Sequence, residues 1–252
     1  MTEVGRHPAE LPTALASALA ETPRWVVMTG SGVSAESGVP TFRDAQTGLW
    51  AKYDPLELAT PEAFERDPEL VWQWYQWRRA LIRDTAPNAA HHALAELQQL
   101  KPGLTLVTQN VDGLHQRAGS TEVVEFHGSI QRNKCFRCER PGPASTDPSP
   151  PRCSECDGLL RPDVVWFGEA IPVDALRAAS RAVDDCDAFL SVGTSSLVYP
   201  AAALADTALS RKALLVEINP NPTPLSARAH FALSGSAAVW LPVIANLVRG
   251  TP

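Results

Sequence analysis

Residues 26–43 read VVMTGSGVSAESGVPTFR, and this stretch decides the fold. Arg24 to Thr29 carries the apolar run that is typical of an inner parallel strand. Gly30 and Gly32 then allow the sharp turn that brings a backbone close to a pyrophosphate. The first N–H groups of the following helix would face that anion. The stretch therefore predicts a nucleotide site that continues into a loop ending in Arg43.

The turn itself, GSGVSA at residues 30–35, fits the G-x-G-x-x-G/A pattern of dinucleotide-binding folds, which also occurs by chance. A Rossmann dehydrogenase places an Asp or Glu at the end of its second strand, about 20 residues further on. Here that distance brings residues 50–54, WAKYD, which do not resemble a strand. An ordinary hydride-transfer enzyme is therefore disfavoured.

Composition limits the class of protein. The chain has 252 residues, of which 44% are hydrophobic, enough for one large domain or for one large and one small domain. The net charge is −6 and the basic residues are scattered, so we expect no nucleic-acid partner. Residues 1–20 do not resemble a secretory signal, and no window reaches the roughly 18 apolar residues that cross a bilayer. We expect a soluble, cytoplasmic monomer with no membrane contact.

Four of the five cysteines form two Cys-x-x-Cys pairs, Cys135/Cys138 and Cys153/Cys156. This spacing is typical of one tetrahedral Zn²⁺ held by four thiolates, which is a closed, structural site. The alternatives are disulfides or a thioredoxin-type redox pair. Both fit less well, because nothing indicates secretion and a redox motif needs only one Cys-x-x-Cys.

Strands and helices alternate along most of the chain, which predicts a doubly wound parallel α/β sheet whose ligands bind at the carboxyl ends of the strands. The expected helices are residues 11–21, 89–100, 173–183 and 200–210, and the further strands are residues 104–108, 123–126, 188–192, 213–218 and 238–241.

Two segments interrupt this alternation, one rich in aromatic residues and one that contains the cysteines. They predict a smaller helical and zinc-binding domain made of residues 46–86 and 129–163. The Rossmann-like domain would then comprise residues 10–45, 87–128 and 164–252.

Polar residues follow four of the expected strands. Amides and a carboxylate at such positions can bind ribose hydroxyls and a carboxamide, and a histidine there can act as a general base. Each residue could instead be an ordinary turn residue; their convergence on one edge favours a site. These residues are Gln109, Asn110 and Asp112, then His127, then Gly193, Thr194 and Ser195, and finally Asn219, Pro220 and Asn221.

Taken together, these motifs resemble the sirtuins, a family of NAD-dependent protein-lysine deacylases. The resemblance extends over nearly the whole chain. The motifs that carry this resemblance are residues 30–43, 109–115 (QNVDGLH), 126–128 (FHG), the paired Cys-x-x-Cys, 167–169 (FGE), 193–195 (GTS) and 218–219 (IN). One departure is Ser31, where the family usually has alanine.

The resemblance implies that NAD⁺ is consumed as a co-substrate and that the zinc is structural. The acyl oxygen of the modified lysine would attack the nicotinamide ribose and release nicotinamide. His127 would then act as the base on a ribose hydroxyl, with Asn110 as the second catalytic residue, giving 2′-O-acyl-ADP-ribose and free lysine. The implied NAD site comprises Gly30, Ser31, Gly32, Ser34, Ala35, Glu36, Phe42, Arg43, Trp50, Gln109, Asn110, Asp112, Gly193, Thr194, Ser195, Asn219, Pro220, Asn221 and Ala237.

The substrate would bind as an added strand along Val164, Val165, Phe167, Gly168 and Glu169. Tyr75 and Arg78 lie one helical turn apart, and a Tyr-x-x-Arg pair here resembles the sirtuin branch that removes succinyl and malonyl groups. A guanidinium and a phenol suit an acyl carboxylate. The alternative is that the helix is merely packed and that Arg78 pairs with Glu65 or Glu69.

The resemblance favours the functional interpretation of Tyr75 and Arg78, with weaker activity on acetyl groups. The loop of residues 44–49, through Ala45, would leave room for a larger acyl group. A general deacetylase, an ADP-ribosyltransferase on the same fold and a non-catalytic reader of modified lysines remain as rival functions.

Overall fold

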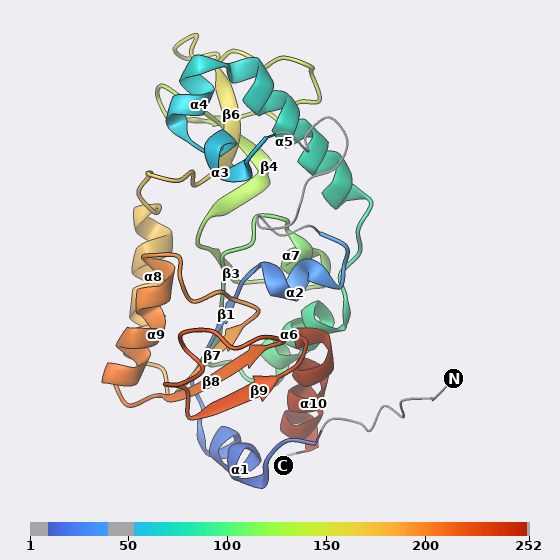
Figure 1. The fold of residues 1–252 in the computed structure, drawn as a ribbon, viewed down its shortest axis with the longest axis vertical. Coiled ribbons are helices and arrows are strands. Elements are labelled where there is room, and N and C mark those ends of the chain that lie inside the picture. Colours follow the sequence, from blue (N-terminus) through green and yellow to red (C-terminus); the bar gives the residue numbers. More distant parts are fainter. Residues whose placement is uncertain (1–9, 40–52, 251–252) are drawn as a thin grey trace.

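The computed structural model describes residues 10–39 and 53–250, and its core is a six-stranded parallel sheet (Figure 1). The strand order is β3-β2-β1-β7-β8-β9, which is the order of the Rossmann fold and confirms the predicted fold class. The strands are β1 (Trp25–Thr29), β2 (Leu104–Thr108), β3 (Val123–Glu125), β7 (Ala188–Val192), β8 (Leu214–Asn219) and β9 (Phe231–Ser234).

The side chains of β1 alternate between the two faces of the sheet, and all of them are buried, which explains the central position of this strand. Trp25 and Val27 point into the core on one face of the sheet, and Val26 and Met28 point into the core on the other. Side chains alternate along a strand, so a run that is apolar throughout must be covered on both faces.

Helices cover both faces. On one face lie α1 (Thr13–Glu21), α6 (Ala89–Leu100) and α10 (Ala237–Gly250), and on the other α8 (Val173–Asp184) and α9 (Ala201–Ser210). Two short helices, α2 (Ser31–Ala35) and α7 (Leu114–Arg117), follow strands β1 and β2.

One sequence prediction is wrong. Residues 238–241 were expected to form the last strand, but they lie in α10, and the edge strand is β9. The buried apolar residues of α10 lie on both sides of Pro242, and they pack against α6 at helical spacing: Leu241, Ile244 and Ala245. A four-residue apolar run does not by itself distinguish a strand from a buried helix.

The second part of the molecule lies beyond one end of the sheet (Figure 1). It contains a three-stranded antiparallel sheet of β4 (Gly128–Cys135), β5 (Pro141–Gly142) and β6 (Leu160–Val164). Three helices pack on it: α3 (Pro55–Leu58), α4 (Pro61–Arg66) and α5 (Pro68–Arg83). Each begins with proline at its first position after a capping Asp or Thr, which is a strong helix start.

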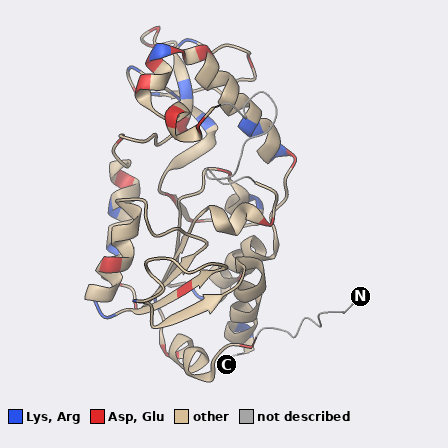
Figure 2. Cartoon of the chain, viewed as in Figure 1, with Lys and Arg blue, Asp and Glu red and all other residues tan. Residues whose placement is uncertain are grey.

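Charged residues of both signs are dispersed over the ribbon, as the sequence suggested (Figure 2). Within residues 10–39 and 53–250, no helix is long and apolar enough to cross a membrane. The sequence-based domain boundaries stay a prediction, although the two sheets belong to its two proposed parts.

Candidate active site

Three glycines bring two loops into backbone contact at the carboxyl edge of the sheet. Gly32 N–H donates to the Gly193 carbonyl at 2.9 Å, and Gly30 N–H donates to the Val192 carbonyl at 3.0 Å. A Cβ on Gly32 would lie 2.8 Å from the Gly193 Cα, so no side chain fits between the loops. The backbone of the turn after β1 therefore lies directly against the backbone of the loop after β7. A pyrophosphate site requires exposed backbone of this kind, which the phosphates can approach closely.

Of these three positions, residue 193 has the strictest requirement for glycine. Its φ is +61°, and a Cβ would lie 2.6 Å from the Val33 nitrogen. We expect Gly193→Ala to lower the free energy of unfolding by about 3 kcal/mol or more, since left-handed strain and a backbone clash add. Urea unfolding measures this. Gly38→Ala is the matched control and should cost about 1–2 kcal/mol, because Gly38 also has positive φ but no described residue lies within 4 Å of a Cβ there. Equal losses in the two variants would contradict the clash.

Asn110, Ser34 and Asp112 form a buried network between the loops after β1 and β2. Asn110 Nδ2 donates to the Gly30 carbonyl at 3.0 Å and to Ser34 Oγ at 3.1 Å. Ser34 O–H donates to the Asp112 carboxylate at 2.8 Å, which also accepts the Leu114 N–H at 2.8 Å. The sequence predicted these three residues as one site, and the structure brings them together.

Burial raises the pKa of Asp112, whereas its two hydrogen bonds and the charges of Arg117 and Arg78 lower it. Only 4% of Asp112 is exposed. These hydrogen bonds therefore hold the carboxyl group in a buried setting, where a further hydrogen bond to a ligand is stronger than in water.

His127 follows β3 and begins the connection to β4. Its Nδ1 lies 3.1 Å from the Gln109 carbonyl, which can only accept, so Nδ1 carries the proton and Nε2 has the free lone pair. Burial lowers the pKa of His127, although this hydrogen bond raises it. Such a histidine is neutral near pH 7 and has the tautomer that a general base at Nε2 needs.

The loops after β7 and β8 are joined as the sequence predicted. Asn219 Nδ2 donates to the Thr194 carbonyl at 2.7 Å, and the buried Thr194 hydroxyl bonds Ser191 Oγ at 2.7 Å. Ser195 is half-buried beside Thr194, while Pro220 and Asn221 are exposed. Ala237 begins α10 on the same edge and is buried.

The remaining predicted NAD residues that the structure describes take no part in these hydrogen bonds between the loops after β7 and β8. Ser31 and Ala35 are exposed on α2, and the exposed Glu36 is the C-cap of that helix. Gln109 lies with Thr194 and Ser196 around a small pocket next to α9. Phe42, Arg43, Trp50 and the loop of residues 44–49 lie outside the described residues.

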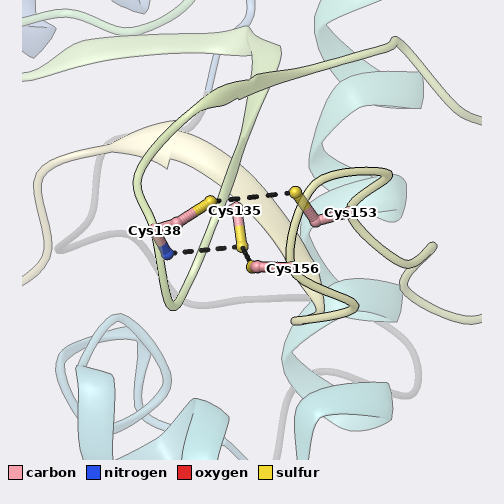
Figure 3. Close-up of side chains that lie close together, drawn as sticks. All are labelled: Cys135, Cys138, Cys153 and Cys156. Carbon is pink, nitrogen blue, oxygen red and sulfur yellow. Dashed lines mark hydrogen bonds between the residues drawn. The ribbon is translucent and has the colours of Figure 1, made fainter.

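The four predicted zinc ligands converge at the end of the second sheet (Figure 3). All four Sγ atoms lie within 4.8 Å of one another, with 3.4 Å between Cys135 and Cys156 and 3.8 Å between Cys138 and Cys153. A tetrahedron with Zn–S bonds of about 2.3 Å has edges of about 3.8 Å, so the thiolates fit one zinc ion. All four positions are filled by protein, which suits a structural site.

The segment of residues 164–169 runs from β6 past His127. Val165 N–H donates to the His127 carbonyl at 2.9 Å, and Phe167 N–H to the Ala59 carbonyl at 2.9 Å. Phe167 and Gly168 are exposed, whereas Glu169 forms an ion pair with the buried Arg161. Glu169 thus has a role within the fold that the sequence did not suggest.

Tyr75 and Arg78 project from α5 into the interior. They are 2% and 8% exposed, and the Arg78 guanidinium lies 5.2 Å from the centre of the Trp74 ring. Among the described residues, no ion pair joins Arg78 to Glu65 or Glu69, the partners that the alternative interpretation named. Burial lowers the pKa of Arg78, whereas the nearby Tyr75 and Asp112 raise it, so this guanidinium lies near the site.

Sequence reasoning assigned no role to two histidines beneath the site, His91 and His115, the second of which ends the motif at residues 109–115. His91 Nδ1 accepts the Asn88 N–H at the start of α6, and its Nε2 lies 3.4 Å from Ser34 Oγ. His115 Nε2 lies 2.9 Å from Thr29 Oγ1, within hydrogen-bonding distance, and burial lowers the pKa of His115 to about 3. The Asn-x-x-His spacing at residues 88–91 is a capping signal that could have revealed the first.

Residues 30–200, more than half of the chain, match the Sir2 family. The chain belongs to the Sir2 family. The predicted resemblance to the sirtuins is thereby confirmed.

Relatives named NAD-dependent protein deacylase match the Sir2 chain over nearly its whole length. The protein from Methylococcus capsulatus is 45% identical over 250 residues, covering 95% of this chain and 98% of that protein. NAD-dependent protein deacylase 1 of Pseudomonas aeruginosa is 49% identical over 239 residues, covering 91% and 96%.

Solved Sir2 structures share the fold. A Sir2 homolog–NAD complex superposes with a TM-score of 0.90 at 44% identity, covering 97% of this chain and 96% of that one. A Sir2–p53 peptide–NAD⁺ complex superposes with a TM-score of 0.80 at 30% identity, covering 92% and 96%.

Proposed function

We propose that this chain removes succinyl and malonyl groups, and acetyl groups more weakly, from protein lysines, and that the products are nicotinamide and 2′-O-acyl-ADP-ribose. The coarser activity, that of an NAD-dependent protein deacylase with a structural zinc, follows from its membership of the Sir2 family and from the cysteine cluster. The acyl preference rests on one observation: Tyr75 and Arg78 are buried side by side near Asp112.

The position of Arg78 supports a function for it beyond packing, because its guanidinium is buried beside Tyr75 and close to the site. Burial lowers the pKa of Arg78, which means that the protein interior disfavours its positive charge. An acyl carboxylate would accept charge-assisted hydrogen bonds from this guanidinium, and Tyr75 would add another donor. An acetyl group offers no such charge.

The remaining roles are assigned by chemistry. His127 Nε2 would take a proton from a ribose hydroxyl after nicotinamide has left, Asn110 and Gln109 would position the ribose, and Asp112 would hold the carboxamide. The rest of NAD⁺ would bind to the backbone at Gly30, Gly32 and Gly193. Residues near this backbone would add further contacts: Ser34, Thr194, Ser195, Asn219, Pro220, Asn221 and Ala237.

An extended peptide would add along Val164, Val165, Phe167 and Gly168. The exposed Phe167 and the proximity of this segment to His127 support that assignment. Main-chain pairing of this kind has little sequence preference, so we propose a range of protein substrates. We further propose a cytoplasmic location and a monomeric state.

We expect the wild type to remove succinyl ten- to a hundredfold faster than acetyl, in kcat/KM, from the same lysine peptide. This range corresponds to charge-assisted hydrogen bonds worth about 1.5–3 kcal/mol. Arg78→Met should abolish the preference and leave deacetylation within about threefold. Mass spectrometry of the peptide with NAD⁺ measures both rates. Arg83→Met is the matched control, because Arg83 is exposed on the same helix.

A wild type that prefers acetyl, or an Arg78→Met variant that loses both activities equally, would make this protein a general deacetylase. The same reactions decide between the rival functions. ADP-ribose left on protein would indicate a transferase, and absence of nicotinamide release would indicate a non-catalytic reader.

A further inference from the structure

Trp166 connects the peptide-binding segment to the proposed acyl pocket. Its indole Nε1–H donates to the Tyr75 hydroxyl oxygen at 2.8 Å, and both side chains are 2% exposed. The two residues are 91 positions apart, and Trp166 lies between Val165 and Phe167 on the proposed substrate strand. The side chain of Trp166 thus contacts the proposed acyl pocket, while the backbone of the same residue belongs to the proposed peptide site.

The direction of this hydrogen bond determines what Tyr75 can do. An indole N–H can only donate, so the Tyr75 oxygen is the acceptor. A phenol O–H prefers the plane of its ring and has two orientations there, one of which the Trp166 N–H occupies. The phenol proton must therefore point away from Trp166. Within residues 10–39 and 53–250, no hydrogen bond uses that proton.

The phenol also stays protonated at working pH. Burial raises the pKa of Tyr75 to about 12, although the Arg78 charge and the Trp166 hydrogen bond lower it. Tyr75 is therefore a donor and not an anion. A donor of fixed direction, one turn from Arg78 on α5, is suited to a carboxylate ligand.

The indole is itself held in place. The Arg161 guanidinium carbon lies 3.2 Å from the centre of the Trp166 ring. Arg161 forms two hydrogen bonds with the Glu169 carboxylate, at 2.5 and 3.0 Å, and Glu169 accepts the Trp166 backbone N–H at 2.7 Å. These contacts leave the indole ring one orientation, and its N–H points at Tyr75.

We propose that Trp166 is a specificity-determining positioning residue, which orients the Tyr75 hydroxyl as a donor toward an acidic acyl group. This inference rests on the proposed function, because it gives Tyr75 the same ligand. Trp166 acts through Tyr75 and not on the reacting atoms. Its loss should therefore affect acidic acyl groups and spare acetyl.

The test is the pair of kcat/KM values for succinyl and acetyl forms of one peptide, measured with Trp166→Phe. We expect succinyl kcat/KM to fall about five- to tenfold, mainly through KM, and acetyl kcat/KM to stay within about twofold. Trp72→Phe is the matched control: the buried Trp72 also donates one indole hydrogen bond, to the Asp147 carbonyl at 2.8 Å, and lies on α5, the helix of Tyr75. It should leave both values within about twofold.

Two further variants separate orientation from packing. Tyr75→Phe should reproduce the selective loss, and adding Trp166→Phe to it should produce no further selective loss, because the two residues act as one unit. Replacing Trp166 by benzothienylalanine removes the N–H but keeps the ring size. It should behave like Trp166→Phe even if the phenylalanine variant is unstable.

The inference is overturned if Trp166→Phe and the benzothienylalanine variant lower both activities equally, if Trp72→Phe shows the same selective loss, or if the double variant loses selectivity beyond Tyr75→Phe. A wild type without a preference for succinyl overturns the proposed function and this inference with it. That failure is recognised from the wild type alone, before any variant is measured.

Discussion

Replacing His127 by asparagine should lower kcat for deacylation by about 10²–10⁴-fold, the range expected when a general base is removed. The asparagine amide can still donate to the Gln109 carbonyl, as Nδ1 does at 3.1 Å, but places no basic atom where Nε2 lies. Because the proposed role of His127 follows nicotinamide release, exchange of labelled nicotinamide into NAD⁺ should continue. Single-turnover deacylation and the exchange assay measure the two steps separately.

The pH profile provides an independent test of the same role. A base must be neutral to act, and burial lowers the pKa of His127 below its usual value of 6.5. Wild-type kcat/KM should therefore persist as the pH falls through 6.5 and decline only at lower pH. His92→Asn, at an exposed position, is the control and should change neither rate nor profile. Loss of nicotinamide exchange in His127→Asn would instead place His127 in the first chemical step or in cofactor binding.

Removing the zinc should have the second largest effect, on stability rather than on chemistry. Structural zinc binding contributes about 10–16 kcal/mol in zinc-finger peptides, so its loss should unfold β4, β5 and β6 locally. Cys135→Ser should purify with less than one zinc per chain and a thermal midpoint lower by on the order of 10 °C or more. Metal analysis and calorimetry measure these two quantities.

Activity should be lost with the zinc, because β4 and β6 carry the connections to His127 and to residues 164–169. Cys186→Ser makes the same chemical change at a buried cysteine outside the cluster, and it should retain one zinc per chain. A Cys135→Ser protein with full zinc content and unchanged melting would show that these cysteines do not hold a metal. Retained activity in a zinc-free protein would show that the second sheet is stable without it.

Patterns among residues close together in the sequence were sufficient to predict much of the fold. The apolar run before Gly30 predicted β1, and the alternation of strands and helices predicted a parallel sheet covered on both faces. The Cys-x-x-Cys spacing predicted a cluster that the structure brings within 4.8 Å. These features depend on residues close in sequence, whose geometry follows from strand and knuckle periodicity.

The strand ends were also predictable as a group, because carboxyl ends of parallel strands share one edge of the sheet. Asn110, Ser34 and Asp112 accordingly meet there. Local pattern failed at residues 238–241, where the apolar run belongs to α10, because only packing against α6 distinguishes a buried helix from a strand in so short a run.

Tertiary structure alone decided how individual side chains act. The tautomer of His127 depends on the Gln109 carbonyl, 18 residues away, and the donor direction of Tyr75 depends on Trp166, 91 residues away. Glu169 is paired with Arg161 within the fold, a role that its place in a substrate motif does not suggest. The sequence thus determines which chemical groups reach the carboxyl edge, since strand order and periodicity are local rules. Protonation, direction and burial of those groups arise from long-range contacts, which exist only once the chain is packed.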